Sequence, residues 1–217
     1  IFPTITKFGM AALLPHKELN VEVRNDKIAV LADGQSTESS NRDKILKKSN
    51  SESIALKYTD IIEMKRAERS ELVKGKKVVY IYHDTIDIAS HTLDSKVFSA
   101  CDDAITEIKN LVRIIVNEFS GTNIIITADH GFLYTYSPLN EYDKVDKTGF
   151  DQMNVEYGRR YAIMKHGAKP DYLLPVKFLN GKTDFEAFAP RENIRIKMNG
   201  GGMNFVHGGI SLQEMVV

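Results

Sequence analysis

Asn123-Ile-Ile-Ile-Thr-Ala-Asp-His-Gly131 is an apolar run that ends in two side chains able to bind a metal ion strongly. Ile124 to Thr127 predicts a buried strand, and Asp129 and His130 follow its carboxyl end. A second run, Val78-Val-Tyr-Ile-Tyr82, has the same form and also leads into polar residues. Because ligands bind beyond the carboxyl ends of the strands in an open parallel sheet, the two runs predict a metal site at that edge.

A long amphipathic pattern separates the two runs. Apolar residues recur at three- and four-residue steps from Lys96 to Phe119, which predicts a helix. Strand, helix and strand form a βαβ unit, whose strands are parallel. We therefore expect an α/β fold with a mostly parallel sheet flanked by helices. The same patterns predict shorter helices over 6–14, 41–48 and 60–74, and further strands within 19–34, 159–164, 173–178 and 185–188.

Composition is that of a folded chain with a sizeable core. Its 217 residues are 42% hydrophobic, and we expect one domain over residues 1–217. The formal net charge of zero gives no support to a nucleic-acid or membrane partner, although a local basic face would be compatible with it. Cys101 is the only cysteine, which excludes an internal disulfide and fits a cytoplasmic protein. The chain opens without a methionine, and we interpret it as a fragment of a longer protein.

Three separated segments carry a set of nitrogen and oxygen donors. Asp87 and His91 are four residues apart, so they share one face if their segment is helical. Asp129 and His130 are adjacent, and His207 precedes two glycines that permit close approach of the backbone. Such a set suits Zn²⁺, with Mn²⁺ or iron as alternatives. Each residue alone also has a structural interpretation as a cap, a surface histidine or a loop hydrogen-bonding group; the metal interpretation rests on the set.

Two threonines near the start are candidate nucleophiles. Thr4 and Thr6 lie in Pro3-Thr-Ile-Thr6, where a helix is predicted to begin. A threonine there is either an ordinary N-cap or a hydroxyl presented beside a bound anion. A two-metal site stabilises both the attacking and the leaving oxygen of an in-line displacement, and a threonine hydroxyl is a suitable attacking group.

Several stretches together resemble one family. They are Pro3-Thr-Ile-Thr-Lys-Phe-Gly-Met-Ala-Ala-Leu-Leu-Pro15, Thr127-Ala-Asp-His-Gly-Phe-Leu-Tyr134 and Val206-His-Gly-Gly-Ile-Ser-Leu-Gln-Glu-Met215. Gly34-Gln-Ser-Thr37 with Asn41-Arg-Asp-Lys-Ile-Leu46 adds to the match. The ordered set is similar to the PglZ domain of BREX phage-defence systems, a branch of the alkaline phosphatase superfamily, and it extends over nearly the whole chain.

The resemblance implies a role for each candidate residue. Two divalent ions, zinc or manganese, are expected in the intact domain. Asp87, His91 and His207 would hold the first; Asp129 and His130 would hold the second together with the nucleophile, Thr6, for which Thr4 is the alternative. Asp84 is a less suitable substitute for Asp87 because its spacing to His91 differs. The superfamily also has an aspartate on a strand before the nucleophile. No residue precedes Ile1, so we expect a core truncated at that N-terminal strand and an incomplete second metal site.

The function that the resemblance implies is metal-dependent hydrolysis of a phosphoryl ester, of the phosphodiesterase type, in bacterial phage defence. A nucleic acid or nucleotide diester is the candidate substrate, and other BREX proteins are the candidate partners. The alternative is an interaction module of the defence complex in which the metal site is inactive or incomplete. A phosphomutase-like enzyme would require a phosphosugar pocket that no sequence pattern indicates.

Overall fold

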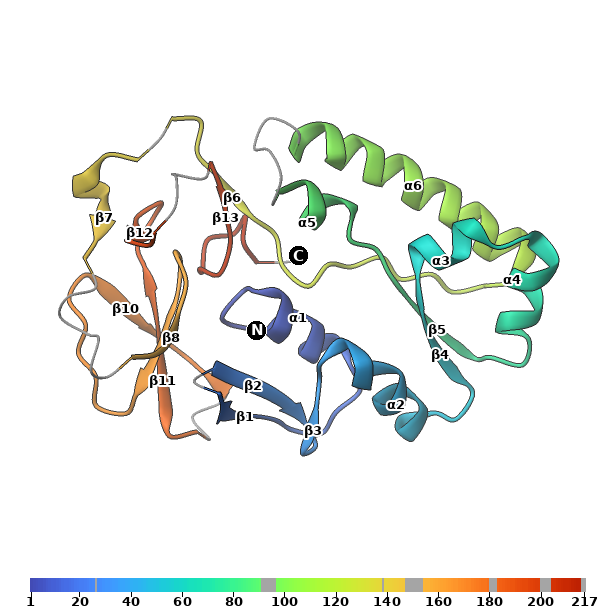
Figure 1. The fold of residues 1–217 in the computed structure, drawn as a ribbon, viewed down its shortest axis with the longest axis horizontal. Helices are drawn as coiled ribbons and strands as arrows, with labels where there is room; N and C mark the ends of the chain where they lie inside the picture. Colours follow the sequence, from blue (N-terminus) through green and yellow to red (C-terminus); the bar gives the residue numbers. More distant parts are fainter. Residues whose placement is uncertain are drawn as a thin grey trace. The chain divides into compact units, whose positions relative to one another are not determined.

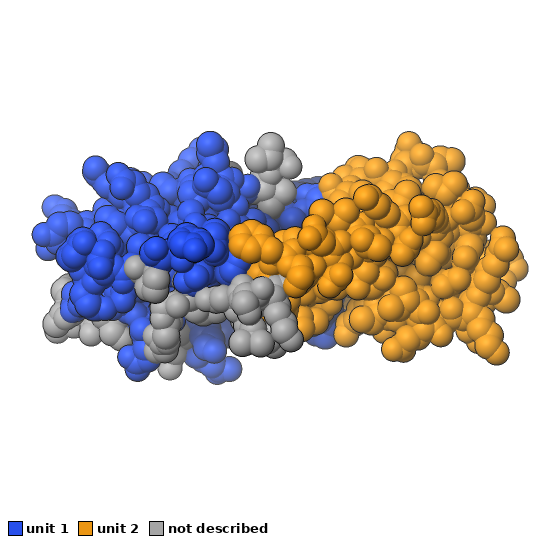
Figure 2. Space-filling model, turned by 90° about the horizontal axis from the view of Figure 1, so that it is seen from above, with its two compact units in different colours: residues 1–41, 127–217 blue, residues 42–126 orange. Residues whose placement is uncertain are grey.

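The computed structural model describes residues 1–25, 27–90, 97–137, 139–146, 154–179, 183–199 and 204–215. The chain divides into two compact units, which are coloured separately in Figure 2. Unit 1 comprises residues 1–41 and 127–217, and unit 2 comprises residues 42–126. The expectation of a single domain over 1–217 stays a prediction.

Unit 1 begins with a helix that packs on a small antiparallel sheet. Helix α1 spans Thr6–Leu13. The strands β1 (Leu19–Arg24), β2 (Lys27–Ala32) and β3 (Gln35–Ser36) follow it in order and pair antiparallel. Phe8 and Ala11 of α1 belong to one buried cluster with Ile28 and Val30 of β2. Figure 1 shows α1 beside β2. Ile28 and Val30 are two residues apart, so they share one face of β2, and α1 packs on that face.

A four-stranded antiparallel sheet forms the other part of unit 1. Its strands are β8 (Asn154–Tyr157), β9 (Ala162–Lys165), β10 (Leu173–Val176) and β11 (Phe185–Pro190), in the spatial order β10-β11-β9-β8. Ile163 joins the core cluster that contains Phe8, whereas its neighbours Ala162 and Met164 join a second cluster with Ile196. Successive side chains of β9 thus bury both faces of the sheet.

Two short strand pairs complete the described part of unit 1. Strand β6 (Leu133–Tyr134) pairs antiparallel with β13 (Phe205–Val206). Strand β7 (Lys144–Val145), which follows a 3-10 helix over Glu141–Asp143, pairs parallel with β12 (Arg195–Ile196). These pairs bring segments together that are about 50 to 70 residues apart in the chain.

Unit 2 holds a parallel strand pair and most of the helices. Helix α2 (Ser39–Ser49) leads into β4 (Ser53–Lys57), which pairs in parallel with β5 (Val78–Tyr82). Helices α3 (Tyr58–Glu63) and α4 (Arg66–Val73) connect the two strands, and α5 (Thr85–Ser90) and α6 (Val97–Glu118) follow β5. The predicted helix over 60–74 is therefore divided at Met64 and Lys65, whose backbones are extended.

The strand predicted over Ile124 to Thr127 is wrong. The segment has no strand pairing, and Ile125 and Ile126 are 90% and 64% exposed. The parallel partner of β5 is β4, which precedes it in the chain, so the predicted βαβ unit is not formed as expected. The fold is a mixed α/β arrangement, and the mostly parallel sheet is not confirmed: within the described ranges, only β4–β5 and β7–β12 pair in parallel. Nor, over these residues, does any helix combine the length and apolar character needed to cross a lipid bilayer.

Candidate metal centre

The two candidate nucleophiles have different surroundings. Thr6 is the first residue of α1, and its Oγ1 lies 3.2 Å from Nε2 of His130. Thr4 is buried, and its hydroxyl donates to the carbonyl of Gly209 at 2.7 Å and accepts from Gly208 N at 3.1 Å. The N-cap of α1 is Ile5, without a side-chain cap, so neither threonine caps this helix. Thr4 thus holds a loop in place, whereas the hydroxyl of Thr6 faces a candidate ligand.

Asp129 and His130 lie together beside Thr6. Oδ2 of Asp129 is 3.6 Å from Nε2 of His130, and their side chains are 17% and 10% exposed. Nδ1 of His130 is 2.9 Å from the carbonyl oxygen of Gly131. Because a carbonyl can only accept, Nδ1 carries the proton and Nε2 keeps its lone pair in the neutral ring. The hydroxyl of Thr6 then donates to Nε2, the nitrogen that a metal ion would bind.

His207 reaches the same place through the pairing of β6 with β13. His130 stands shortly before β6, and His207 directly follows β13. The antiparallel register that sets Val206 opposite Leu133 brings the two histidines together. Their rings stack with centroids 4.0 Å apart and planes 10° apart. Nδ1 of His207 lies 3.3 Å from the carbonyl of Thr4, which favours the same tautomer as in His130.

The remaining predicted ligands belong to unit 2 or lie outside the described residues. Asp87 is half-buried in α5, a short helix in a segment whose conformation the sequence had left open. His91 lies outside the described residues, so the expected grouping of Asp87, His91 and His207 stays a prediction. Asp84 is exposed just before α5. The start of this helix is fixed by Glu107, whose carboxylate binds His83 at 2.6 Å and Thr85 at 2.7 Å.

The donors gathered in unit 1 fit the chemistry of the second expected metal ion. His130 Nε2 has an oxygen of Thr6 and an oxygen of Asp129 within 3.6 Å. One imidazole, one carboxylate and one hydroxyl are a donor set that suits Zn²⁺ or Mn²⁺. Among the described residues, no group of three His, Cys, Asp or Glu side chains is arranged to hold an ion. The third donor of this set is the hydroxyl of Thr6.

A glycine lets α1 approach the Asp129 loop closely. A β-carbon at Gly9 would collide with the backbone carbonyl of Asp129 and would lie 2.7 Å from its β-carbon. The helix that carries Thr6 therefore lies against the segment that carries two candidate ligands. The requirement for glycine is one of space, because Gly9 sits in a regular helix.

The substitution Gly9→Ala tests this contact, because helix propensity and the contact predict opposite changes in the free energy of unfolding. Helix propensity alone would stabilise the chain by about 1 kcal/mol. The collision with the Asp129 backbone predicts the opposite, a destabilisation of about 1–3 kcal/mol. We expect urea denaturation to show a lower free energy of unfolding for the variant. A stabilised Gly9→Ala chain would mean that α1 and the Asp129 loop are not in contact.

Sequence reasoning missed a buried ion pair next to this site. Arg160 and Glu214 have side chains 1% and 0% exposed, and their charged groups are 3.0 Å apart. The Ser-x-x-Glu spacing from Ser211 to Glu214 is the sequence pattern of a capping box at the start of a helix. The Glu214 side chain does reach back to the Ser211 backbone N–H at 3.2 Å, but the segment forms turns and no helix. No local pattern pointed to Arg160 as a partner.

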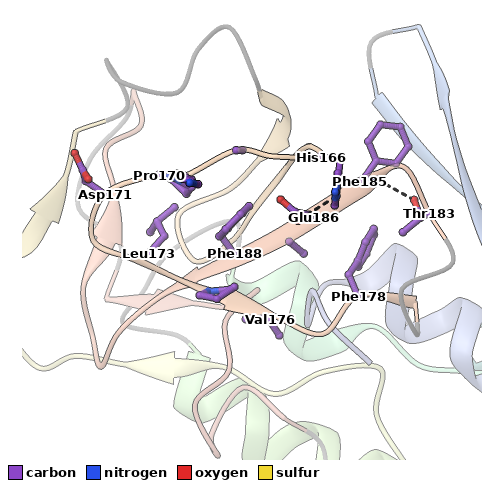
Figure 3. A pocket seen from close by; sticks show the side chains of 14 residues that line it. His166, Pro170, Asp171, Leu173, Val176, Phe178, Thr183, Phe185, Glu186 and Phe188 are labelled. Atoms are coloured by element: carbon purple, nitrogen blue, oxygen red, sulfur yellow. Dashed lines mark hydrogen bonds and ion pairs between the residues drawn. The ribbon is translucent and has the colours of Figure 1, made fainter.

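Unit 1 also contains an open hollow of about 590 Å³ on the four-stranded sheet (Figure 3). Phe178, Phe185 and Phe188 contribute apolar surface, and Nδ1 of His166 lies 3.1 Å from the Glu186 carboxylate. None of the candidate ligands lines this hollow, so it is separate from the Thr6 site.

A family model and two individual relatives place this chain in the same family. The family model described as "BREX system PglZ alkaline phosphatase-like domain" matches residues 1–217. Two similar relatives are the alkaline phosphatase-like protein BrxZ of Escherichia coli O9:H4 (strain HS), 38% identical over 222 residues, and the alkaline phosphatase-like protein PglZ of Bacillus cereus (strain H3081.97), 35% identical over 228 residues. Both alignments cover 100% of this chain but only 25% and 26% of the relatives, so the chain spans about a quarter of their length. No solved structure matches. With its whole length covered by the family model, the chain belongs to the PglZ family of BREX alkaline phosphatase-like domains.

Proposed function

We propose that this chain carries the nucleophile and part of the metal-ligand set of a metal-dependent phosphoryl-ester hydrolase, of the phosphodiesterase type, that acts in bacterial phage defence. The observation that supports it most is the position of the Thr6 hydroxyl, 3.2 Å from His130 Nε2, with the Asp129 carboxylate 3.6 Å from the same nitrogen. A hydroxyl, a carboxylate and an imidazole meeting at one point are the groups that a metal-assisted displacement at phosphorus requires.

Each residue has a definite task in this proposal. Asp129 and His130 would bind one divalent ion together with Thr6. His207 would bind the other ion together with Asp87 and His91. When bound, such an ion supplies positive charge that stabilises the alkoxide of the nucleophile and the oxygens of the phosphoryl group. The Thr6 oxygen, its proton lost to solvent, would form the bond to phosphorus while the ester oxygen leaves with the bonding electrons and takes up a proton. Water would then break the bond between phosphorus and the Thr6 oxygen, which releases the phosphoryl group and restores the hydroxyl. The N-terminus of α1 favours the anionic phosphoryl group beside Thr6.

The wider context is part of the same proposal. Zinc is the ion we favour, with manganese as the alternative, because the donors are nitrogen and oxygen atoms. A nucleic acid or nucleotide diester is the substrate class in this proposal. The family description names the BREX system, which supports other BREX proteins as the partners. The test is hydrolysis of bis(p-nitrophenyl) phosphate by the metal-loaded protein. Turnover that depends on the ion and on Thr6 supports the proposal, and its absence from the metal-loaded native protein contradicts it.

A further inference from the structure

Arg160 and Glu214 form a buried ion pair in unit 1. Besides their bonds to each other, both side chains form hydrogen bonds with other parts of the chain. Arg160 donates from Nε to Oε1 of Glu214 at 3.1 Å and from Nη2 to Oε2 at 3.0 Å. Its Nη1 donates to the carbonyl of Ile194, at the turn before β12. The fork geometry therefore holds the Glu214 carboxylate in one orientation, from a residue that is 54 positions away in the chain.

The carboxylate of Glu214 fixes the loop that follows His207. It accepts from Gly209 N at 2.8 Å, from Ser211 N at 3.2 Å and from Ser211 Oγ at 2.8 Å. A β-carbon at Gly209 would lie 2.5 Å from Oε2 of Glu214 and 2.9 Å from Nε of Arg160. The loop is thus pressed against the ion pair, only two residues after the candidate ligand His207.

The main chain around Glu214 fixes the loop that follows His130. The carbonyl of Glu214 accepts from Gly131 N at 2.9 Å, and a β-carbon at Gly131 would collide with the carbonyl of Gln213. One residue therefore holds both loops, one through its side chain and the other through its backbone. Thr4 adds a third connection, because its hydroxyl and carbonyl bind the segment from His207 to Gly209.

We propose that the Arg160–Glu214 pair is the positioning element that sets how His130 and His207 lie relative to each other. It fixes the backbone one residue after His130 and two residues after His207. The consequence of this pair for catalysis rests on the proposed function, whereas its effect on the positions of the two histidines does not. Burial opposes ionisation of Glu214, and the hydrogen bonds from Arg160, Ser211 and Gly209 outweigh that effect and lower its pKa, so the carboxylate is charged and holds all of its donors at neutral pH.

The test is Glu214→Gln, read out at the two histidines of the metal-free protein. The amide keeps the shape but turns one acceptor oxygen into a donor, so at least one of the Arg160, Gly209 and Ser211 donors loses its partner. We expect the imidazole nitrogen resonances of both His130 and His207 to shift. We also expect the dissociation constant for zinc to rise about tenfold to a hundredfold, as when groups that orient metal ligands are removed.

The matched control is Glu118→Gln, which breaks the two-pronged pair with Arg69 between α6 and α4 in unit 2. We expect it to lower stability without moving either histidine resonance. Ser211→Ala is the milder variant if Glu214→Gln does not fold: it removes one donor and should shift the His207 resonance more than that of His130. The proposal is overturned if the folded variants leave both resonances in place, or if Glu118→Gln shifts them equally. A native chain that binds no zinc would sink the proposed function, while the metal-free resonances would still decide the positioning role.

Discussion

Replacing Thr6 by alanine is expected to lower phosphodiester turnover by at least about a thousandfold, the order seen when an enzyme loses its nucleophile. The Oγ1 of Thr6 is the hydroxyl oxygen that lies 3.2 Å from His130 Nε2, and the proposed bond to phosphorus forms at this atom. Serine at the same position retains a hydroxyl, so Thr6→Ser should keep a measurable part of the activity. The measurement is the initial rate of bis(p-nitrophenyl) phosphate hydrolysis with the metal-loaded proteins.

A second threonine of unit 1 supplies the control for this experiment. The Thr37 hydroxyl is buried and donates to the carbonyl of Val30 at 2.9 Å, in the sheet beneath α1. Thr37→Ala therefore removes a buried hydroxyl without touching the candidate site, and we expect its turnover to stay close to the native rate. Native turnover in Thr6→Ala would contradict the assignment of the nucleophile, whatever the result at Thr37.

The variant Arg160→Met is expected to destabilise the chain by about 3–5 kcal/mol, because it leaves a carboxylate buried without its counter-charge. Glu214 is fully buried and would keep only the donors of its own loop, Gly209 and Ser211. Urea denaturation at neutral pH measures the loss as a change in the free energy of unfolding. Lys74→Met is the matched control, since its pair with Glu71 is 72% exposed at both side chains and should contribute little.

The effect of pH on the Arg160→Met comparison has a definite sign. The pKa of Glu214 in the folded chain lies below its ordinary value of 4.5. Burial raises this pKa, but the hydrogen bonds and the charge of Arg160 lower it by more. A carboxyl whose folded pKa is lowered stabilises the fold above its unfolded pKa, and this contribution is lost as the pH falls through the folded value. The gap between native and Arg160→Met stability should therefore narrow in acid. A gap that is the same at neutral and acid pH would mean that the pair does not behave as a buried ion pair.

Local sequence patterns predicted the helices and strands whose apolar residues follow a regular spacing along a short stretch of chain. The apolar run of β5 and the amphipathic period of α6 appear at the expected positions. The structure places Thr6, the first residue of α1, beside Asp129 and His130, and the roles of these residues in a metal site stay a prediction. The positions of β5 and α6 were predictable because each follows from the pattern of residues within the element itself.

Features that depend on distant pairing were not predictable in the same way. The apolar run from Ile124 to Ile126 has the pattern of a buried strand, yet Ile125 and Ile126 are exposed, because an apolar run is buried only where another element covers it. Arg160 and Glu214 are 54 residues apart, and no short sequence pattern connects them. The Ser-x-x-Glu spacing indicates only the local contact between Glu214 and Ser211. Register between β6 and β13, which brings the histidines together, is likewise a long-range property.

Metal content per chain, measured by elemental analysis after zinc loading and desalting, tests the metal site most directly. We expect the native chain to retain about one ion or more, and His130→Ala to retain about one ion less, because a bound ion needs each of its ligands. His166→Ala is the control, since that side chain is 79% exposed and lies at the separate hollow, and it should bind as the native chain does. Equal zinc content in the native and His130→Ala chains, or none in the native chain, would contradict the account.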